Sequence, residues 1–362
     1  MTRHRIPGNP DEAARKLLGF LMEQKRVRGA MVLAEVNPGK YAFTLITDSA
    51  LLDRAAPLAP LMPVNAASMV SRLTMLSPAP GPIVVVLRPC ELRALFELVK
   101  LEQAKLNNLL LVSFTCGGVL PTRSTSDGAD FEPAAYRQAL IAAEMPEGLR
   151  DTCRACERFV PAGADVTIAA VGSDGATDVL AETDKGGQFL DGWAEPEAGE
   201  PDRDAVDRLA QARVGAAPEV LARFAPEKMG LAGLVALFGR CINCRACSKA
   251  CPVCYCSACH FDSADAKQDL SATRDELDRR GGLRLPAGTV HFHVGRMLHV
   301  SLSCVGCGMC SDACPMDIPV ASVFTRLAGR VQGMFDYVAG RNAEEALPTS
   351  VFKTEELEEI GA

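Results

Sequence analysis

Two cysteine motifs of identical spacing constrain this chain more than any other feature. Each reads C-x2-C-x2-C-x3-C-P, with Cys241, Cys244, Cys247 and Cys251 in the first copy and Cys304, Cys307, Cys310 and Cys314 in the second. This is the bacterial pattern for two 4Fe-4S clusters, in which the fourth cysteine of each copy binds the other cluster. We therefore predict two ligand sets: set 1 is Cys241, Cys244, Cys247 and Cys314, and set 2 is Cys304, Cys307, Cys310 and Cys251.

A structural zinc site is the main alternative for these cysteines. Its usual pattern is two separated cysteine pairs, which does not account for the repeated third cysteine and the C-P ending. Gly306 and Gly308 lie between the cysteines of the second copy. Glycine leaves backbone N–H groups free to approach the cluster sulfides, and such contacts tune the reduction potential.

The first motif lies in a longer cysteine-rich stretch, CINCRACSKACPVCYCSAC, with seven cysteines between positions 241 and 259. The ferredoxin pattern uses four of them and leaves Cys254, Cys256 and Cys259. We expect these three to lie near the clusters without binding iron. An additional metal site is the alternative.

Composition limits the class of protein. The net charge of -7 and the small aromatic content argue against a nucleic-acid surface, which is usually basic. The first residues lack the apolar run of a signal peptide, and the apolar stretches are too short for a membrane span. We expect a cytoplasmic protein, where a reducing environment leaves its fifteen cysteines available for metal.

The first half of the sequence predicts an α/β domain. A helix is expected at 11–27, and a hairpin at 31–36 and 41–46 around the turn NPGK. The apolar runs 82–87 and 109–114 predict buried strands that flank a helix at 91–103, which is the order of a parallel β-α-β unit. A third strand of this type is expected at 165–172.

The second half predicts mainly helices, at 205–225, 263–280 and 321–340. We divide the chain into an α/β domain (1–182), to which the resemblance given below assigns a flavin and a 4Fe-4S cluster, a linker and helix (183–235), a ferredoxin-like domain with two clusters (236–340) and an acidic tail (341–362). The expected fold class is thus an α/β domain with a mixed or parallel sheet, followed by a mostly α ferredoxin-like domain.

Four further cysteines predict a third site in the α/β domain; they are Cys90, Cys116, Cys153 and Cys156, here called set 3. Two of them follow predicted strands, at the sheet edge where sites of parallel α/β proteins are built. From spacing alone, a four-thiolate metal site, including zinc, and ordinary buried cysteines both remain open.

The sequence resembles the beta subunits of coenzyme F420-dependent formate dehydrogenases and hydrogenases, most closely the formate dehydrogenase type. The stretches that carry the resemblance are RPCELRALFELVKLEQAKLNNLLLVSFTCGG, CRACERFVPAGADV, CINCRACSKACPVCYC and HVSLSCVGCGMCSDACPMDIPVASVF. They occur in the order of the family and spread over most of positions 82–335.

The resemblance implies an FAD and three 4Fe-4S clusters, with set 3 binding the third. It also implies a flavin near the turn Gly172-Ser173-Asp174-Gly175, and Arg88 could face a flavin phosphate or a cluster. The chain would be an oxidoreductase subunit that relays electrons between flavin and partner redox centres. The implied partner is a molybdopterin formate dehydrogenase alpha-like or heterodisulfide-reductase-like subunit, and ferredoxin, NAD(H) or a deazaflavin are further candidates.

The N-terminus departs from the family pattern. Members usually begin with a glycine-pair segment near the flavin, whereas this chain reads IPGNPDEAARK. We therefore predict a remodelled flavin loop, and a flavin-free relay between two larger enzymes is the alternative function. A structural or regulatory zinc protein is the third hypothesis.

Three smaller features receive structural interpretations. His299 is expected to donate to a sulfide near Cys304 rather than to bind iron. His291 and His293 alternate in TVHFHV as on a strand, and we interpret both as structural residues. No residue is assigned as catalytic.

Overall fold

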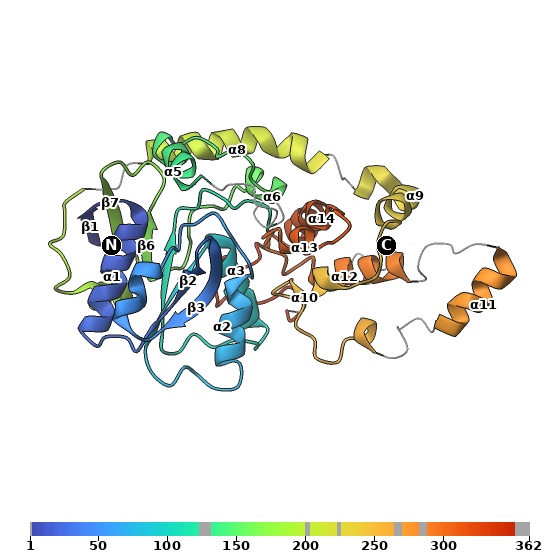
Figure 1. Cartoon of the computed structure of the whole chain (residues 1–362), viewed down its shortest axis with the longest axis horizontal. Coiled ribbons are helices and arrows are strands. Elements are labelled where there is room, and N and C mark those ends of the chain that lie inside the picture. The colour runs from blue at the N-terminus through green and yellow to red at the C-terminus, as the bar shows by residue number, and fades with distance from the viewer. Residues whose placement is uncertain are drawn as a thin grey trace.

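A seven-stranded mixed sheet organises the first half of the chain (Figure 1). The computed structural model describes residues 2–122, 132–199, 203–222, 226–263, 270–281 and 288–351. The strands are β1 (Thr2–Pro7), β2 (Ala30–Asn37), β3 (Lys40–Ile46), β4 (Ile83–Leu87), β5 (Leu109–Phe114), β6 (Val166–Ala169) and β7 (Ala176–Ala181). Their order across the sheet is β1-β7-β6-β5-β4-β2-β3. Strands β2, β4, β5 and β6 run parallel, and antiparallel strands complete both edges.

The structure confirms the predicted hairpin and the parallel β-α-β unit. Strands β2 and β3 pair antiparallel, while β4, β5 and β6 are consecutive parallel neighbours. The sequence analysis missed β1 and β7, because the strand TRHRIP is too polar to read as one. Arg3 and Arg5 of β1 form ion pairs with Asp178 of β7, which accounts for those charges at the sheet edge.

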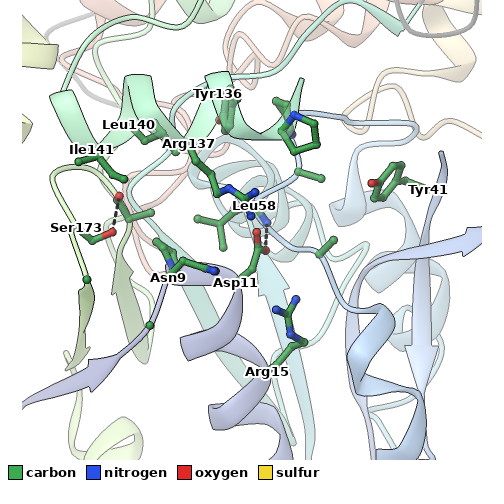
Figure 2. A pocket seen from close by; sticks show the side chains of 18 residues that line it. Asn9, Asp11, Arg15, Tyr41, Leu58, Tyr136, Arg137, Leu140, Ile141 and Ser173 are labelled. Carbon is green, nitrogen blue, oxygen red and sulfur yellow. Dashed lines mark hydrogen bonds between the residues drawn. The ribbon is translucent and has the colours of Figure 1, made fainter. Parts of the chain in front are cut away.

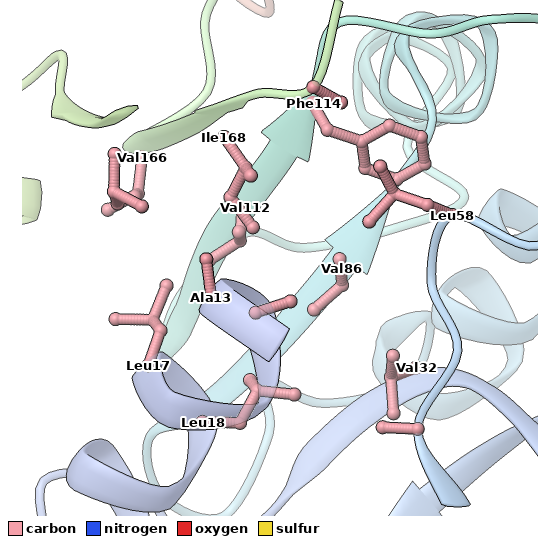
Figure 3. Close-up of a cluster of buried hydrophobic side chains, with 14 of the residues drawn as sticks. Ala13, Leu17, Leu18, Val32, Leu58, Val86, Val112, Phe114, Val166 and Ile168 are labelled. Carbon is pink, nitrogen blue, oxygen red and sulfur yellow. The ribbon is translucent and has the colours of Figure 1, made fainter. Parts of the chain in front are cut away.

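Helices cover both faces of the sheet. They are α1 (Pro10–Glu23), α2 (Ala66–Thr74), α3 (Pro89–Lys100), α5 (Pro133–Ala142), α6 (Asp151–Arg154), α7 (Asp184–Leu190) and α8 (Asp204–Ala222), with the 3-10 helix η1 (Ser49–Arg54). Ala13, Leu17 and Leu18 of α1 pack against Val86 and Val112 on one face (Figure 3). The opposite face packs against α2 and α3.

Successive side chains of β4 point to opposite faces of the sheet, which explains why helices pack on both faces. Val84 and Val86 belong to the apolar cluster under α1, and Ile83, Val85 and Leu87 belong to the cluster under α2 and α3. A strand buried on both faces is apolar at every position, which is why this segment reads as a continuous run rather than an alternating one. Burial of each side chain contributes about 1.5–3 kcal/mol.

The second half of the chain is helical. Its elements are α9 (Pro226–Phe238), α10 (Ala246–Lys249), the 3-10 helix η2 (His260–Asp262), α11 (Leu270–Arg280), α12 (Thr289–Val300), α13 (Met309–Asp312) and α14 (Val320–Met334). Phe238, Met297, Val300 and Phe324 form its apolar core with the cysteines of the motifs. Helix α8 extends from the sheet domain to this part and contacts both α6 and α14 (Figure 1).

Several predicted boundaries change. The segment TVHFHV is the beginning of helix α12 and not a strand, because Phe292, Arg296 and Val300 recur every fourth residue on its buried face. Helix α8 continues through Gly215 and Pro218, and residues 223–225 of the predicted helix lie outside the described residues. The helix predicted at 263–280 appears as α11 from Leu270, with 264–269 outside the described residues.

The C-terminal segment returns to the sheet domain. The Tyr337 hydroxyl donates to Glu97 Oε1 of α3 at 2.5 Å, the Gly340 N–H donates to the same oxygen at 2.7 Å, and Leu347 is buried. The acidic tail predicted from 341 therefore begins with packed residues, and 352–362 lie outside the described residues. In the described ranges, none of the helices is long and apolar enough to cross a membrane.

Candidate iron-sulfur centres and flavin pocket

The four cysteines of set 1 surround one small cavity. Cys241 and Cys244 lie on the loop that leads into α10, Cys247 is in α10, and Cys314 follows α13. All four line the cavity, together with Ile242, Arg245, Phe292, His293, Ile318 and Val320 among others. The arrangement brings the last cysteine of the second motif to the first three of the first motif.

The cysteines of set 2 surround a neighbouring cavity in the reciprocal way. Cys251 reaches it from the first motif, while Cys304, Cys307 and Cys310 come from the loop before α13 and its first turn. The sides of this cavity include Arg296, Val300 and Phe324. The structure therefore brings together each four-cysteine set expected from the crossed ligand pattern, and iron ligation itself stays a prediction.

The two motif loops have the same backbone conformation. Asn243 and Arg245 have positive φ values of 57° and 61° in the first loop, and Gly306 and Gly308 have φ values of 70° and 84° at the corresponding positions. A non-glycine residue in this left-handed backbone conformation costs roughly 1–2 kcal/mol, and the first loop contains two of them. Such left-handed positions turn successive N–H groups toward an anion, which explains why the loops keep a strained conformation.

Backbone N–H groups are directed at several of the sulfurs. Cys241 Sγ accepts from the Asn243 N–H at 3.4 Å, Cys116 Sγ from Gly118 at 3.4 Å, and Cys153 Sγ from Val119 at 3.4 Å. Hydrogen bonds of this kind stabilise negative sulfur and raise the reduction potential of an iron-sulfur cluster. The loops therefore fit thiolate-bound clusters.

The four thiols of set 3 also lie close together, at the carboxyl edge of the parallel strands. Cys90 is in the first turn of α3, Cys116 follows β5, Cys153 is in α6, and Cys156 follows α6. Burial raises the pKa of Cys153 to about 11, with further contributions from the neighbouring thiols of Cys116 and Cys156. Burial likewise raises the pKa of Cys90, beside Cys116 and Cys153.

Sets 2 and 3 adjoin each other. Cys307 of set 2 is among the groups that raise the pKa of Cys90 in set 3, after burial and Glu91. Cys90, Cys153 and Cys307 pack against one apolar cluster that contains Met62. A Cβ atom at Gly308 would lie only 2.5 Å from Thr152 Oγ1 of α6, so glycine permits this close approach of the two loops.

The ligands of a cubane cluster are arranged differently from the ligands of one ion. Four thiolates of a 4Fe-4S cluster bind four different irons, so they surround a volume instead of meeting at a point. Within the described ranges, no group of three or more His, Cys, Asp or Glu side chains is arranged to hold a single metal ion.

A larger cavity of about 330 Å³ lies at the same edge of the sheet, and we call it the edge pocket (Figure 2). It is lined by Gly8, Asn9, Pro10, Asp11, Arg15, Tyr41, Ala56, Leu58, Ala59, Pro60, Pro133, Tyr136, Arg137, Leu140, Ile141, Ala170, Ser173 and Gly175. Its size is within the range of small-molecule sites, and its lining is mostly apolar with a few charged groups.

The edge pocket meets the predicted flavin turn only in part. Ser173 and Gly175 line it, whereas Gly172 and Asp174 do not. Gly172 instead packs against Ala205, where a Cβ would come within 2.4 Å. The N-terminal segment that departs from the family pattern supplies Gly8 through Asp11, so it forms part of the pocket wall.

Arg88 does not line the edge pocket but is buried behind it. Its guanidinium donates to Ala59 O at 2.5 Å, lies 3.7 Å from Glu91 Oε2, and stacks over Phe114. Burial lowers the pKa of Arg88, but the charges of Glu91 and Cys116 outweigh that effect and raise the pKa overall. The guanidinium therefore stays charged between the pocket and set 3.

The edge pocket has the chemistry that a flavin needs. Tyr41, Leu58 and Ile141 offer an aromatic and apolar surface for a ring system, and Arg15 and Arg137 offer cations for a phosphate (Figure 2). Asp11 lies between the two arginines and accepts a hydrogen bond from the Leu58 N–H at 3.1 Å. Burial raises the pKa of Asp11 above its ordinary value, while the Leu58 N–H and the neighbouring arginines oppose that rise.

The histidine that lies beside a predicted cluster ligand is His293, and not His299 as the sequence analysis expected. His299 is exposed and does not line the cavity around Cys304. His293 is instead buried, with Nε2 3.4 Å from Cys241 Sγ and its ring stacked on Phe238. Burial, followed by the charge of Arg296, lowers the pKa of His293 to about 3, so the imidazole is neutral. A helical reading of TVHFHVGR could have placed His293 and Arg296 on the buried face.

The surplus cysteines gather beside the first motif. Cys254 lies beside the guanidinium of Arg296 and near Cys256 and Cys259. Cys259 packs with Cys247 and the rings of Phe261 and Phe292. These positions lie next to the predicted clusters, as expected for residues that surround them.

Two family models match parts of the chain. Residues 238–318 match the family described as 4Fe-4S dicluster domain, so the helical C-terminal region contains a 4Fe-4S cluster domain. Residues 82–200 match the family that describes the C terminus of the coenzyme F420 hydrogenase/dehydrogenase beta subunit. The latter segment contains all four cysteines of set 3 and the loop after β6.

Two relatives match most of the chain. The chain is 25% identical, over 93% of its length and 93% of the relative's, to the F420-dependent formate dehydrogenase subunit beta of Methanocaldococcus jannaschii. It is 25% identical to the F420-dependent formate dehydrogenase 1 subunit beta of Methanococcus maripaludis, over 72% of this chain and 74% of that one. The chain is a homologue of these beta subunits, which confirms the resemblance found in its sequence.

A chain in a structure entitled xenon derivatization of the F420-reducing [NiFe] hydrogenase complex from Methanosarcina barkeri is also similar. The identity is 14% and the TM-score 0.45, with 64% of this chain and 94% of that chain covered.

Proposed function

We propose that this chain is the electron-transfer subunit of a multi-subunit oxidoreductase of the F420-dependent formate dehydrogenase and hydrogenase type. It would relay electrons between an FAD in the edge pocket and partner redox centres through three 4Fe-4S clusters. The observation that carries the proposal is the succession of adjoining sites: the edge pocket, set 3, set 2 and set 1.

The step between the edge pocket and set 3 is short. Tyr136 lines the pocket, and its hydroxyl donates to Gly118 O at 2.8 Å, on the loop that holds Cys116. Burial raises the pKa of Tyr136, and the thiols of Cys116 and Cys153 raise it further, so it stays a neutral donor beside set 3. The same loop therefore contributes to both sites.

The second step runs from set 3 to set 2 through Cys90 and Cys307. Both side chains contact the apolar cluster around Met62, which excludes water between the sites. Arg150 donates to Cys307 O at 3.2 Å and forms a buried ion pair with Asp312 of α13. This ion pair fixes the helical half against the sheet domain at the point of transfer.

The third step follows from the crossed motifs, since Cys251 and Cys314 each connect one loop to the other cavity. Of the twelve thiols in the three sets, Cys244 alone is exposed. Set 1 is therefore the site at which an electron can pass to or from a partner protein.

A flavin, when bound, exchanges two electrons with a hydride donor or acceptor, whereas a 4Fe-4S cluster changes by one electron. The residues of the chain hold these groups, exclude water from between them and set their potentials. The names of the two relatives favour a deazaflavin as the hydride partner and a molybdopterin formate dehydrogenase alpha-like subunit as the redox partner. Heterodisulfide-reductase-like subunits, ferredoxin and NAD(H) are the other partners to test.

Iron and flavin analysis of the anaerobically purified complex tests the proposal. We expect about twelve Fe per copy of this chain, roughly four for each cubane, and one FAD released on denaturation. The Cys116→Ala variant should contain about eight Fe, because only set 3 is lost. Twelve Fe without flavin would favour a flavin-free relay, and zinc in place of iron would refute an electron-transfer role.

A further inference from the structure

Arg296 of α12 is a buried cation in the helical half of the chain. Its side chain is 2% exposed and lies between the rings of Phe292 and Phe324, at 5.7 and 4.8 Å from their centroids. Nη1 donates to Cys247 Sγ at 3.2 Å and Nη2 donates to Cys247 O at 3.2 Å. The guanidinium is thus bound to the sulfur and the carbonyl of one predicted ligand.

The charge of Arg296 has no carboxylate partner within the described part of the chain. Other buried arginines differ, since Arg88 lies against Glu91 and Arg150 against Asp312. A buried charge without a counter-charge costs several kcal/mol, so a stable fold that contains one needs an anion nearby. The groups available are the thiols, namely Cys247, Cys251, Cys310 and Cys254.

These thiols belong to both predicted clusters. Cys247 is in set 1, while Cys251 and Cys310 are in set 2, and Arg296 also lines the set 2 cavity. Cys254, one of the surplus cysteines, lies beside the same guanidinium. A cluster with four thiolates carries net negative charge, and an added electron makes it more negative.

We propose that Arg296 is a positioning residue that serves as the shared counter-cation of the set 1 and set 2 clusters, held in place by its two bonds to Cys247. The inference rests on the proposed function, because it requires both clusters. When one electron leaves one cluster and enters the other, no bond forms or breaks and no proton moves. The negative charge then stays beside the same guanidinium, so Arg296 stabilises the reduced form of either cluster and keeps their potentials close.

Redox titration followed by EPR spectroscopy on the anaerobic complex tests this inference. In Arg296→Gln we expect both the set 1 and set 2 potentials to fall, each by at least tenfold in the reduction equilibrium, or about 59 mV for one electron. The set 3 potential should stay unchanged and serves as an internal reference. Arg296→Lys keeps the charge and should restore most of the shift, and Arg279→Gln, an exposed charge on α11, should shift neither.

Cys254 gives a second and milder test, which also covers the case in which Arg296→Gln fails to assemble. Cys254→Ala removes a polar neighbour of the guanidinium and should keep full iron content while lowering both potentials in the same direction. Cys254→Ser, which retains a polar side chain there, should have a smaller effect. The inference is overturned if the Cys254→Ala potentials are unchanged, if only one cluster responds, or if Arg296→Lys behaves as Arg296→Gln does. If the wild-type chain contains its clusters and the variants give any of these results, this inference alone is overturned. If the wild-type chain contains fewer than two clusters, the proposed function is overturned as well.

Discussion

The buried ion pair between Arg150 and Asp312 offers a direct test of how the two halves of the chain are joined. Its side chains are only 4% and 7% exposed. Arg150 also donates to Met62 O at 3.3 Å and to Cys307 O at 3.2 Å. Asp312 has a second partner, since the Thr122 hydroxyl and N–H donate to it at 2.8 and 3.0 Å.

Removal of one partner should be far more costly than removal of both. Breaking a buried pair leaves an uncompensated charge and costs about 3–5 kcal/mol, whereas apolar replacement of the whole pair is often neutral. Asp312→Leu leaves the guanidinium of Arg150 with two carbonyl groups, so we expect the upper part of this range. Arg150→Met leaves Asp312 with its two bonds from Thr122, so we expect the lower part. The double variant should lie within about 1 kcal/mol of the wild type.

The assay is thermal unfolding of the anaerobic protein at a fixed scan rate, followed by the visible absorbance of the clusters. At about 2 °C per kcal/mol for a chain of this size, each single change should lower the midpoint by roughly 6–10 °C. Arg154→Ala removes a half-exposed pair with Asp151 on the same helix and should cost no more than about 1 kcal/mol. Single changes as mild as this control, or a double variant as unstable as the sum of both, would refute the reasoning.

Three further predictions concern the sites. Cys251→Ala and Cys314→Ala should each remove about four Fe, and EPR spectra should show the loss of set 2 in the first and of set 1 in the second, the reverse of an uncrossed assignment. Arg137→Gln should weaken FAD binding about tenfold, or about 1.4 kcal/mol, with iron content unchanged in the metal analysis. The raised pKa of Asp11 means that its contribution to stability is present below the ordinary pKa of 3.8 and is lost as pH rises through the folded-state pKa. Asp11→Asn should therefore unfold at a higher temperature than the wild type at pH 7, and thermal scans should show the difference shrinking as pH falls.

The sheet and the cysteine sets could be predicted because their signals are local. A β-branched run bounded by turns, such as 82–87, specifies a buried strand by itself. The repeated C-x2-C-x2-C-x3-C-P spacing likewise encodes ligand geometry in a few consecutive residues. The strands β1 and β7, at one side of the sheet, carry no such signal. Their stability depends on ion pairs between residues about 175 positions apart, such as Arg5 with Asp178.

The flavin site illustrates a different limit. The turn at 172–175 was predicted as a whole, yet only Ser173 and Gly175 line the edge pocket. The other walls come from the first residues of α1, the segment after η1 and helix α5, which no sequence pattern brings together. Arg88 was expected to face a ligand, but the nearby acceptor Glu91 and the Ala59 carbonyl bind its guanidinium inside the protein.

The positions of two arginines at the junctions between the sites, Arg93 and Arg296, could not have been predicted from spacing, yet they follow one physical rule. Arg93 lies near Cys156 and Cys90 of set 3 and Cys304 of set 2, and Arg296 lies between sets 2 and 1. Each cluster site concentrates negative charge in a region of low dielectric constant, where an unpaired charge of either sign is costly. A cation placed at a junction would offset the negative charge of both neighbouring clusters, so one guanidinium would serve two sites. The positions of these arginines therefore follow from the electrostatic requirement that the proposed cluster sites impose.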